Sequence, residues 1–181
     1  MRANKISRRR FLKETLLGTA FLSTARFLPS AAVAAEALTR IPDTLLYFSP
    51  KEFLIFEAIA DRIIGASPTG LPGSADVGVA ARADQFLHRA DPEIQEQFHQ
   101  LLTVFNAPLF TFLFDFRFSS FLSMSPEDKD SYLEDWMTSV LGIRRTGFQA
   151  LKRICMSMFY THRSSWSEIG YEGMFMPEDR K

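Results

Sequence analysis

Cysteine and histidine are scarce in this chain, which has one cysteine, Cys155, and three histidines among 181 residues. A single cysteine cannot form an intrachain disulfide, and it excludes the C-x-x-C and C-x-x-C-H motifs of redox and haem-attachment sites. A closed zinc site needs about four Cys, His or carboxylate ligands at short spacings, and the chain offers no such cluster. Glycine-rich phosphate motifs and the nucleophile elbow G-x-S-x-G are also absent. The sequence therefore predicts no catalytic, cofactor or metal site in this chain.

Glycine and proline are also few, nine of each, whereas 46% of the residues are hydrophobic and 18 are Phe. This composition excludes a disordered or collagen-like chain. The formal net charge is zero, but seven of the 21 Lys and Arg and only one of the 21 Asp and Glu lie in residues 1–34. Residues 35–181 therefore carry six more acidic than basic groups. Because nucleic acid requires a basic face, we expect no nucleic acid partner.

Residues 1–34 have the organisation of an export signal. A basic segment is followed by an uncharged stretch, Thr15 to Ala25, and then by small residues that include Ala32-Val33-Ala34, a typical cleavage site. The uncharged stretch spans only about half of a ~30 Å hydrocarbon core, so it would be a weak membrane anchor. We therefore predict a signal peptide over residues 1–34 and one domain over residues 35–181.

The basic segment resembles the twin-arginine translocation (Tat) signal at every position. The matching residues are Ser7, Arg8, Arg9, Phe11, Leu12 and Lys13. An ordinary secretory signal is the alternative, and Arg26 directly after the uncharged stretch disfavours it. The resemblance implies recognition by the Tat translocase, which exports proteins already folded in the cytoplasm. Such a signal serves a protein that binds its cofactor before export, or one that carries a partner with no signal of its own.

The rest of the chain has the periodicity of helices. Ser49-Pro50-Lys51-Glu52 is a capping-box start, and apolar residues follow at i, i+3 and i+4 spacing up to Ile64. Further helices are predicted from about residue 75 to 89, from residue 92 through 105, and near residues 145–162. Ser125-Pro126 repeats the Ser-Pro start and predicts a helix from residue 126 to 141, which Gly142 ends. In the last helix Cys155 lies in the apolar stripe, where a free cysteine usually behaves as a small buried hydrophobe. The predicted fold is all-α, a small irregular bundle of about five to six helices.

Residues 109–118 are ambiguous. Phe alternates with other residues there, as in a strand, but Phe110, Phe114, Phe118 and Phe121 also recur at helical spacing. We favour a helix because every assigned neighbour is helical and a lone strand would leave its backbone unpaired. The rings can fill the core or form a patch for a partner, and the first reading is the simpler one.

The C-terminal segment beyond His162 has neither helical nor strand periodicity, yet it is rich in large apolar residues. Such an extended aromatic tail either covers its own bundle or lies across another protein. Aromatic residues and Met are enriched in interface hot spots. The expected partner contacts are Tyr160, Trp166, Tyr171, Met174 and Phe175.

Several segments together resemble a known family. They are the leader, L-x-F-x-A-I-A-D-R-I-I at residues 54–64, S-P-E-x-K-x-x-Y-L-x-x-W at residues 125–136, and the closing Phe159-Tyr160-Thr161, Trp166 and Ile169-Gly170-Tyr171-x-Gly173. These segments are similar to subunit 3, or gamma, of membrane-bound gluconate 2-dehydrogenase and of related FAD-dependent sugar dehydrogenases.

This resemblance implies a role in a three-part periplasmic enzyme. A large flavoprotein of the glucose–methanol–choline (GMC) type would hold FAD and oxidise the sugar or sugar acid, and a multihaem cytochrome with haem c would take the electrons. The small subunit would carry no cofactor, supply the export signal, stabilise the flavoprotein, and associate with the membrane through the complex. The alternatives are a free-standing periplasmic binding or structural protein and a stand-alone helical enzyme.

Overall fold

A computed structural model describes residues 41–65, 72–107, 119–166 and 170–172. The chain divides into two units, residues 1–40 and 41–181, and all described residues belong to the second unit. The signal motif, the Phe-rich segment 109–118 and the end of the tail therefore lie outside the described residues, so their predicted conformations stay predictions.

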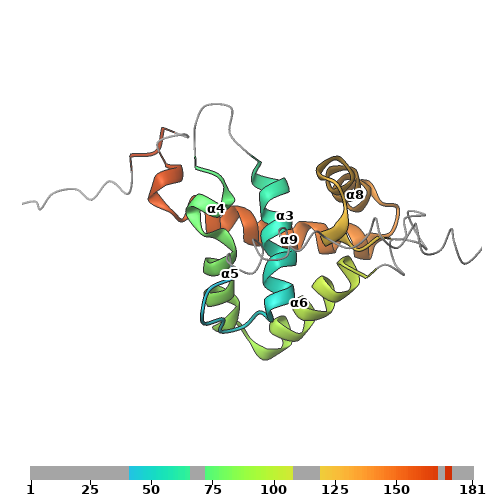
Figure 1. Ribbon diagram of the computed structural model, residues 1–181, viewed down its shortest axis with the longest axis horizontal. Helices are drawn as coiled ribbons and strands as arrows, with labels where there is room; N and C mark the ends of the chain where they lie inside the picture. The colour runs from blue at the N-terminus through green and yellow to red at the C-terminus, as the bar shows by residue number, and fades with distance from the viewer. Residues whose placement is uncertain (1–40, 66–71, 108–118, 167–169, 173–181) are drawn as a thin grey trace, which may run out of the picture. The chain divides into compact units, whose positions relative to one another are not determined.

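The described part of the chain is entirely helical, which confirms the predicted all-α class. Its elements are α3 (Pro50–Ile64), α4 (Ser74–Val77), α5 (Val79–His88), α6 (Pro92–Phe105), η1 (Phe121–Ser123), α8 (Pro126–Thr138), α9 (Gly142–Tyr160) and η2 (Arg163–Ser165), where η denotes a 3-10 helix. Within these residues there are six α-helices and no strand. Figure 1 shows α3 in the middle of this group.

Two helices begin at the serines that the sequence indicated. The Ser49 Oγ accepts a hydrogen bond from the Glu52 backbone N–H, and Glu52 in return accepts from the Ser49 backbone N–H at 2.9 Å. The Ser125 Oγ accepts in the same way from the Asp128 backbone N–H at 3.1 Å. Because these N–H groups have no partner inside the helix, each cap stabilises its helix start by about 1 kcal/mol.

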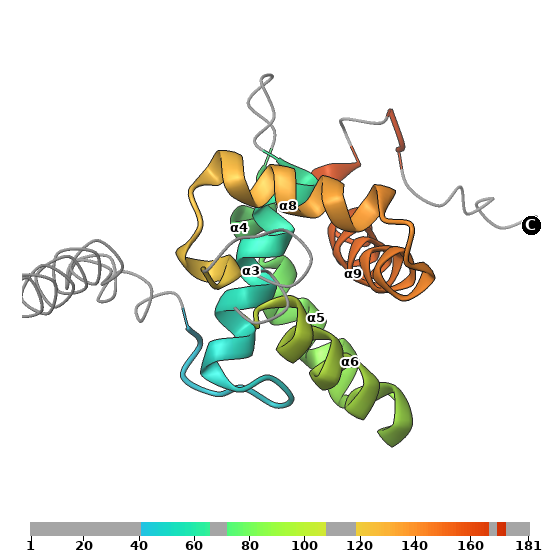
Figure 2. The same ribbon diagram turned by 90° about the vertical axis from the view of Figure 1, so that its right-hand side faces the viewer.

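The core forms around α3. Phe56 and Ile59 of α3 are fully buried, and α4, α5, α6, α8, α9 and η1 all contact this helix. Figure 2 shows α8 crossing above α3, with α9 to the right of α3 and α5 and α6 below α9. On the surface Arg62 of α3 forms an ion pair with Asp130 of α8. The predicted apolar stripe of residues 53–64 is therefore the centre of the fold.

A group of aromatic rings joins α6, η1 and α8. The Phe105 ring lies 4.8 Å from Phe121, 5.1 Å from Tyr132 and 4.7 Å from Trp136, between ring centroids. The buried Tyr132 hydroxyl donates a hydrogen bond of 2.9 Å to the Phe105 backbone oxygen at the end of α6. Tilted and edge-to-face pairs of this kind add about 0.5–1.5 kcal/mol each beyond simple burial.

Three predicted helix boundaries were wrong. The helix expected over residues 75–89 is divided into α4 and α5 by Gly78, whose φ of 68° interrupts the α-helix. The helix expected to reach residue 141 ends at Thr138, so Val140 and Leu141 are exposed and not part of a buried stripe. Gly142 begins α9 at a point where we expected it to end the preceding helix. These errors share one cause, because sequence periodicity does not report where the backbone turns.

Gly147 lies close to the side chains of α6 and α8. A Cβ built on this residue of α9 would lie 2.8 Å from the Leu101 Cδ1 and 2.9 Å from the Trp136 Cζ3. Real Cβ atoms do not approach other atoms so closely, so α9 can lie against α6 and α8 at this point only with glycine.

We expect Gly147→Ala to lower the free energy of unfolding by about 1–3 kcal/mol, because the methyl group must displace the Trp136 ring. Gly142→Ala is the matched control in the same helix, since the nearest atom to its Cβ is an Arg145 nitrogen at 4.0 Å. The control should be neutral or slightly stabilising. Urea unfolding of both variants measures the difference, and equal stability would contradict the proposed packing constraint.

Candidate functional site

Three of the five predicted contact residues lie together at the end of α9 and just after it. The Trp166 indole N–H donates a hydrogen bond of 2.8 Å to the Tyr160 backbone oxygen. The Trp166 and Tyr171 rings meet edge to face with centroids 5.1 Å apart. Tyr160 and Tyr171 remain 43% and 45% exposed. We call Tyr160, Trp166 and Tyr171 the aromatic cluster.

Backbone geometry holds the aromatic cluster in place. The Ser165 hydroxyl, which is buried, donates to the Phe159 and His162 backbone oxygens, and this anchors η2 to the end of α9. The chain then turns back through Gly170, whose φ is 64°, so that the Tyr171 backbone N–H donates to the Trp166 backbone oxygen at 3.0 Å. A left-handed φ of this kind favours glycine.

The surface character of the aromatic cluster suits a protein contact. The Arg163 guanidinium lies 5.8 Å from the centre of the Trp166 ring, in range of a cation–π interaction. Tyr, Trp and Arg are the residue types most enriched in interface hot spots. Met174 and Phe175, the other two predicted contacts, and the signal residues Ser7 to Lys13 lie outside the described residues.

Cys155 is buried in α9, as its apolar neighbours predicted. Burial raises the pKa of the Cys155 thiol to about 12. Since the thiolate is the reactive form, this cysteine is chemically inert in the folded protein. Among the described residues, no group of three or more His, Cys, Asp or Glu side chains is placed to hold a metal ion. The described helices also include none with the length and apolar character needed to span a membrane.

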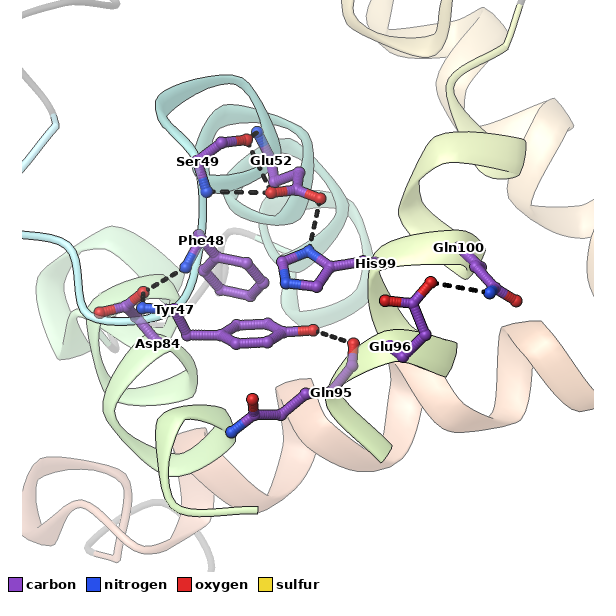
Figure 3. A network of polar contacts seen from close by, with 9 residues as sticks. All are labelled: Tyr47, Phe48, Ser49, Glu52, Asp84, Gln95, Glu96, His99 and Gln100. Carbon is purple, nitrogen blue, oxygen red and sulfur yellow. Dashed lines mark hydrogen bonds and ion pairs between the residues drawn. The ribbon is translucent and has the colours of Figure 1, made fainter. Parts of the chain in front are cut away.

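A buried carboxylate that sequence analysis missed fastens the segment before α3. Asp84 of α5 is only 3% exposed, and its two oxygens accept hydrogen bonds from the backbone N–H groups of Leu46, Tyr47 and Phe48 at 2.7–2.9 Å. Figure 3 shows this carboxylate turned towards residues 47 and 48. Three such donors offset the cost of burying the charge. The predicted helix 75–89 gave no sign of this role, because the acceptor and its donors lie 36 or more residues apart.

Next to Asp84, a second group of polar contacts joins the same segment to α3 and α6 (Figure 3). The Tyr47 ring stacks on His99 with centroids 4.3 Å apart, and its hydroxyl donates to the Gln95 backbone oxygen at 2.5 Å. His99 Nδ1 lies 2.7 Å from the Glu52 Oε1. Burial, reinforced by the charges of Glu52 and Glu96, raises the pKa of Tyr47. Tyr47 is therefore neutral. These contacts fasten the segment before α3 to α3 and α6, and they have no evident chemical role.

Comparison with protein-family models identifies one family, gluconate 2-dehydrogenase subunit 3, over residues 50–173. The match covers more than half of the chain. The protein belongs to the gluconate 2-dehydrogenase subunit 3 family. Comparisons with curated proteins and with solved structures found no significant match. The family match confirms the resemblance seen in the sequence.

The subunit 3 match begins at the first residue of α3 and ends just past Tyr171. It therefore includes the helical core and the aromatic cluster, whereas the predicted signal peptide lies before it. The subunit 3 family takes its name from one component of a multi-subunit enzyme. In such a component the functional site to look for is a surface that meets another chain.

The contact between Glu52 and its neighbours should make stability depend on pH. Burial alone would raise the pKa of Glu52, but hydrogen bonds from Ser49 and His99 outweigh it and lower the pKa below its ordinary value of 4.5. A lowered pKa contributes stability above the unfolded-state value, and that contribution is lost as the pH falls through the folded-state value.

We therefore expect Glu52→Gln to be less stable than the wild type by about 1 kcal/mol at pH 7, with the gap closing as the pH falls from about 5 to about 3. Urea unfolding across this pH range measures the gap. Lys51→Gln, an exposed neighbour, is the control and should show no such convergence. A gap that stays constant down to pH 3 would contradict the assigned role of Glu52.

Proposed function

We propose that this chain is the non-catalytic small subunit of an exported FAD-dependent sugar or sugar-acid dehydrogenase, and that it carries its flavoprotein partner through the twin-arginine pathway. The observation that supports the proposal most directly is the subunit 3 family match over residues 50–173. In this proposal FAD lies in a large GMC-type subunit and haem c in a multihaem cytochrome subunit.

The leader supplies the second argument. Its Ser-Arg-Arg-x-Phe-Leu-Lys motif at residues 7–13 is an address for folded cargo. A flavoprotein must bind FAD and fold before export, so an escort with this signal has to bind its partner in the cytoplasm. The complex would then work in the periplasm and associate with the membrane through its other subunits.

The aromatic cluster supplies the third argument. Two half-exposed tyrosines and a tryptophan, held by hydrogen bonds and a glycine turn, form a preorganised surface. Preorganisation matters because side chains that are already ordered lose little entropy on binding. A standard interface of about 1,600 Å² can then support a lasting complex.

The twin-arginine signal can be tested by Arg8→Lys together with Arg9→Lys. We expect both this protein and the flavoprotein to remain in the cytoplasm, because the export receptor reads the arginine pair. Arg10→Lys is the matched control, since it makes the same chemical change one residue beyond the pair. Cell fractionation with flavin fluorescence and immunoblots measures the distribution. A flavoprotein that still reaches the periplasm with the double variant would refute the escort function.

The aromatic cluster can be tested by Trp166→Ala. We expect the Kd for the flavoprotein to rise about thirtyfold, a loss of about 2 kcal/mol, because large aromatic side chains dominate interface energies. Phe86→Ala, which removes an exposed ring from α5, is the matched control. Co-purification and titration of the tagged proteins provide the measurement, with thermal unfolding to show that both variants fold. Equal binding by the two variants would remove Trp166 from the interface.

A further inference from the structure

The turn between α8 and α9 carries the most exposed large apolar side chains in the described part of the chain. Val140 is 92% exposed and Ile143 is 82% exposed, and the neighbouring Met137 and Leu141 are also exposed. We call these four residues the apolar tip. Single exposed apolar residues are ordinary, but four within seven positions form a patch of the kind that marks interaction sites.

Hydrogen bonds within the turn between α8 and α9 fix the backbone at the apolar tip. The Leu141 backbone N–H donates to the Ser139 Oγ at 3.2 Å, and the Arg145 guanidinium donates to the Ser139 backbone oxygen. These bonds order the three residues between the helices. The tip is therefore a defined shape on which a partner can bind without first ordering it.

The solvent face of α9 is basic. This helix contains four basic residues and no acidic residue, whereas α8 contains five acidic residues and one lysine. Arg145, Lys152 and Arg153 are exposed, while the Arg144 guanidinium lies 5.3 Å from the centre of the Trp136 ring. Within the described residues neither Arg145 nor Arg153 forms an ion pair. Arg145 also holds the turn through its bond to Ser139, whereas the exposed Lys152 and Arg153 have no evident role within the described fold.

The basic face connects the apolar tip to the aromatic cluster. Arg145, Gln149, Arg153 and Tyr160 follow one another at spacings of four, four and seven residues, so they share one side of the helix. The 19 residues of α9 extend about 28 Å, with the tip at one end and Tyr160 at the other. One rigid helix thus has an apolar group at each end, and basic residues lie between these groups along the sequence.

We propose that the apolar tip and the basic face of α9 form a second docking surface for the flavoprotein subunit, and that this partner presents an apolar recess bordered by carboxylates. The inference rests on the proposed function and specifies where the partner binds. The apolar anchors supply affinity by leaving water, and the arginines steer association and fix the direction in which the partner lies along α9.

An anionic membrane is the competing occupant, and the packing of α9 disfavours it. A helix that lies on a membrane buries one continuous apolar face among the lipids. In α9 that face consists of Phe148, Leu151, Cys155, Met158 and Phe159, and all of them are already buried in the core. The solvent-facing side of α9 is polar along its length and is apolar only at the two ends of the helix.

The test compares four variants in cells that co-express this chain with the large flavoprotein subunit of the same complex. Val140→Asp with Ile143→Asp places charges in the apolar tip, and Ile94→Asp, an exposed position on α6, is its control. Lys152→Glu with Arg153→Glu reverses the basic face without touching the bond between Arg145 and Ser139, and Lys51→Glu, exposed on α3, is its control. All changes lie on the surface, and thermal unfolding verifies that each variant folds.

We expect the tip variant to raise the Kd for the flavoprotein about thirtyfold, and the charge-reversed variant about tenfold at about 150 mM salt, with the second effect shrinking as salt increases. Both controls should bind like the wild type. If the wild type binds and both surface variants bind equally well, this inference is wrong while the proposed function stands. If the wild type itself does not bind, the proposed function fails.

Sedimentation with phosphatidylglycerol–phosphatidylethanolamine vesicles tests whether the basic face binds a membrane instead of the flavoprotein. We expect no difference between the wild type and the charge-reversed variant in this assay. Loss of vesicle binding by that variant, with unchanged binding to the flavoprotein, would assign the basic face to lipid and overturn the proposal.

Discussion

The structure depends on the burial of α3. Phe56 and Ile59 of this helix are fully buried, and the other described helices contact it from several sides. Burying a large apolar side chain stabilises a protein by about 1.5–3 kcal/mol, and this 15-residue helix buries Phe53, Ile55, Phe56 and Ile59 in the core. Because α3 is surrounded, each outer helix must turn its own apolar face inward. The solvent-facing side chains of the outer helices can then contact a partner.

The helix α9 illustrates this division. Its apolar face packs against α3, α5 and α8, and Gly147 lets it approach Trp136 closely. Its other face carries the exposed basic residues Lys152 and Arg153. At its far end the hydroxyl of Ser165 and the indole of Trp166 bond back to the last turn, which orders the aromatic cluster. Core packing and the proposed interface therefore use opposite sides of one rigid helix.

The segment before α3, residues 46–48, is fixed by contacts with several helices. Asp84 accepts three backbone N–H groups from residues 46–48, and Tyr47 packs on His99 beside the capping box of α3. Under the proposed twin-arginine export, this domain would fold before translocation. Because residues 46–48 contact α3, α5 and α6, the start of the described domain is held against its core.

The sequence alone determined the helical class, the capped starts at Ser49 and Ser125, the burial of Cys155 and the family, because these depend on local spacing and on motif residues. It also indicated Tyr160, Trp166 and Tyr171, of which the structure shows the arrangement but not the partner. Only the tertiary structure decided that Gly78 divides a helix, that Val140 lies outside the core, and that Asp84 binds residues 46–48. The Asp84 contact joins residues far apart in sequence, and the other two depend on where the backbone turns, so periodicity carries no information about any of them.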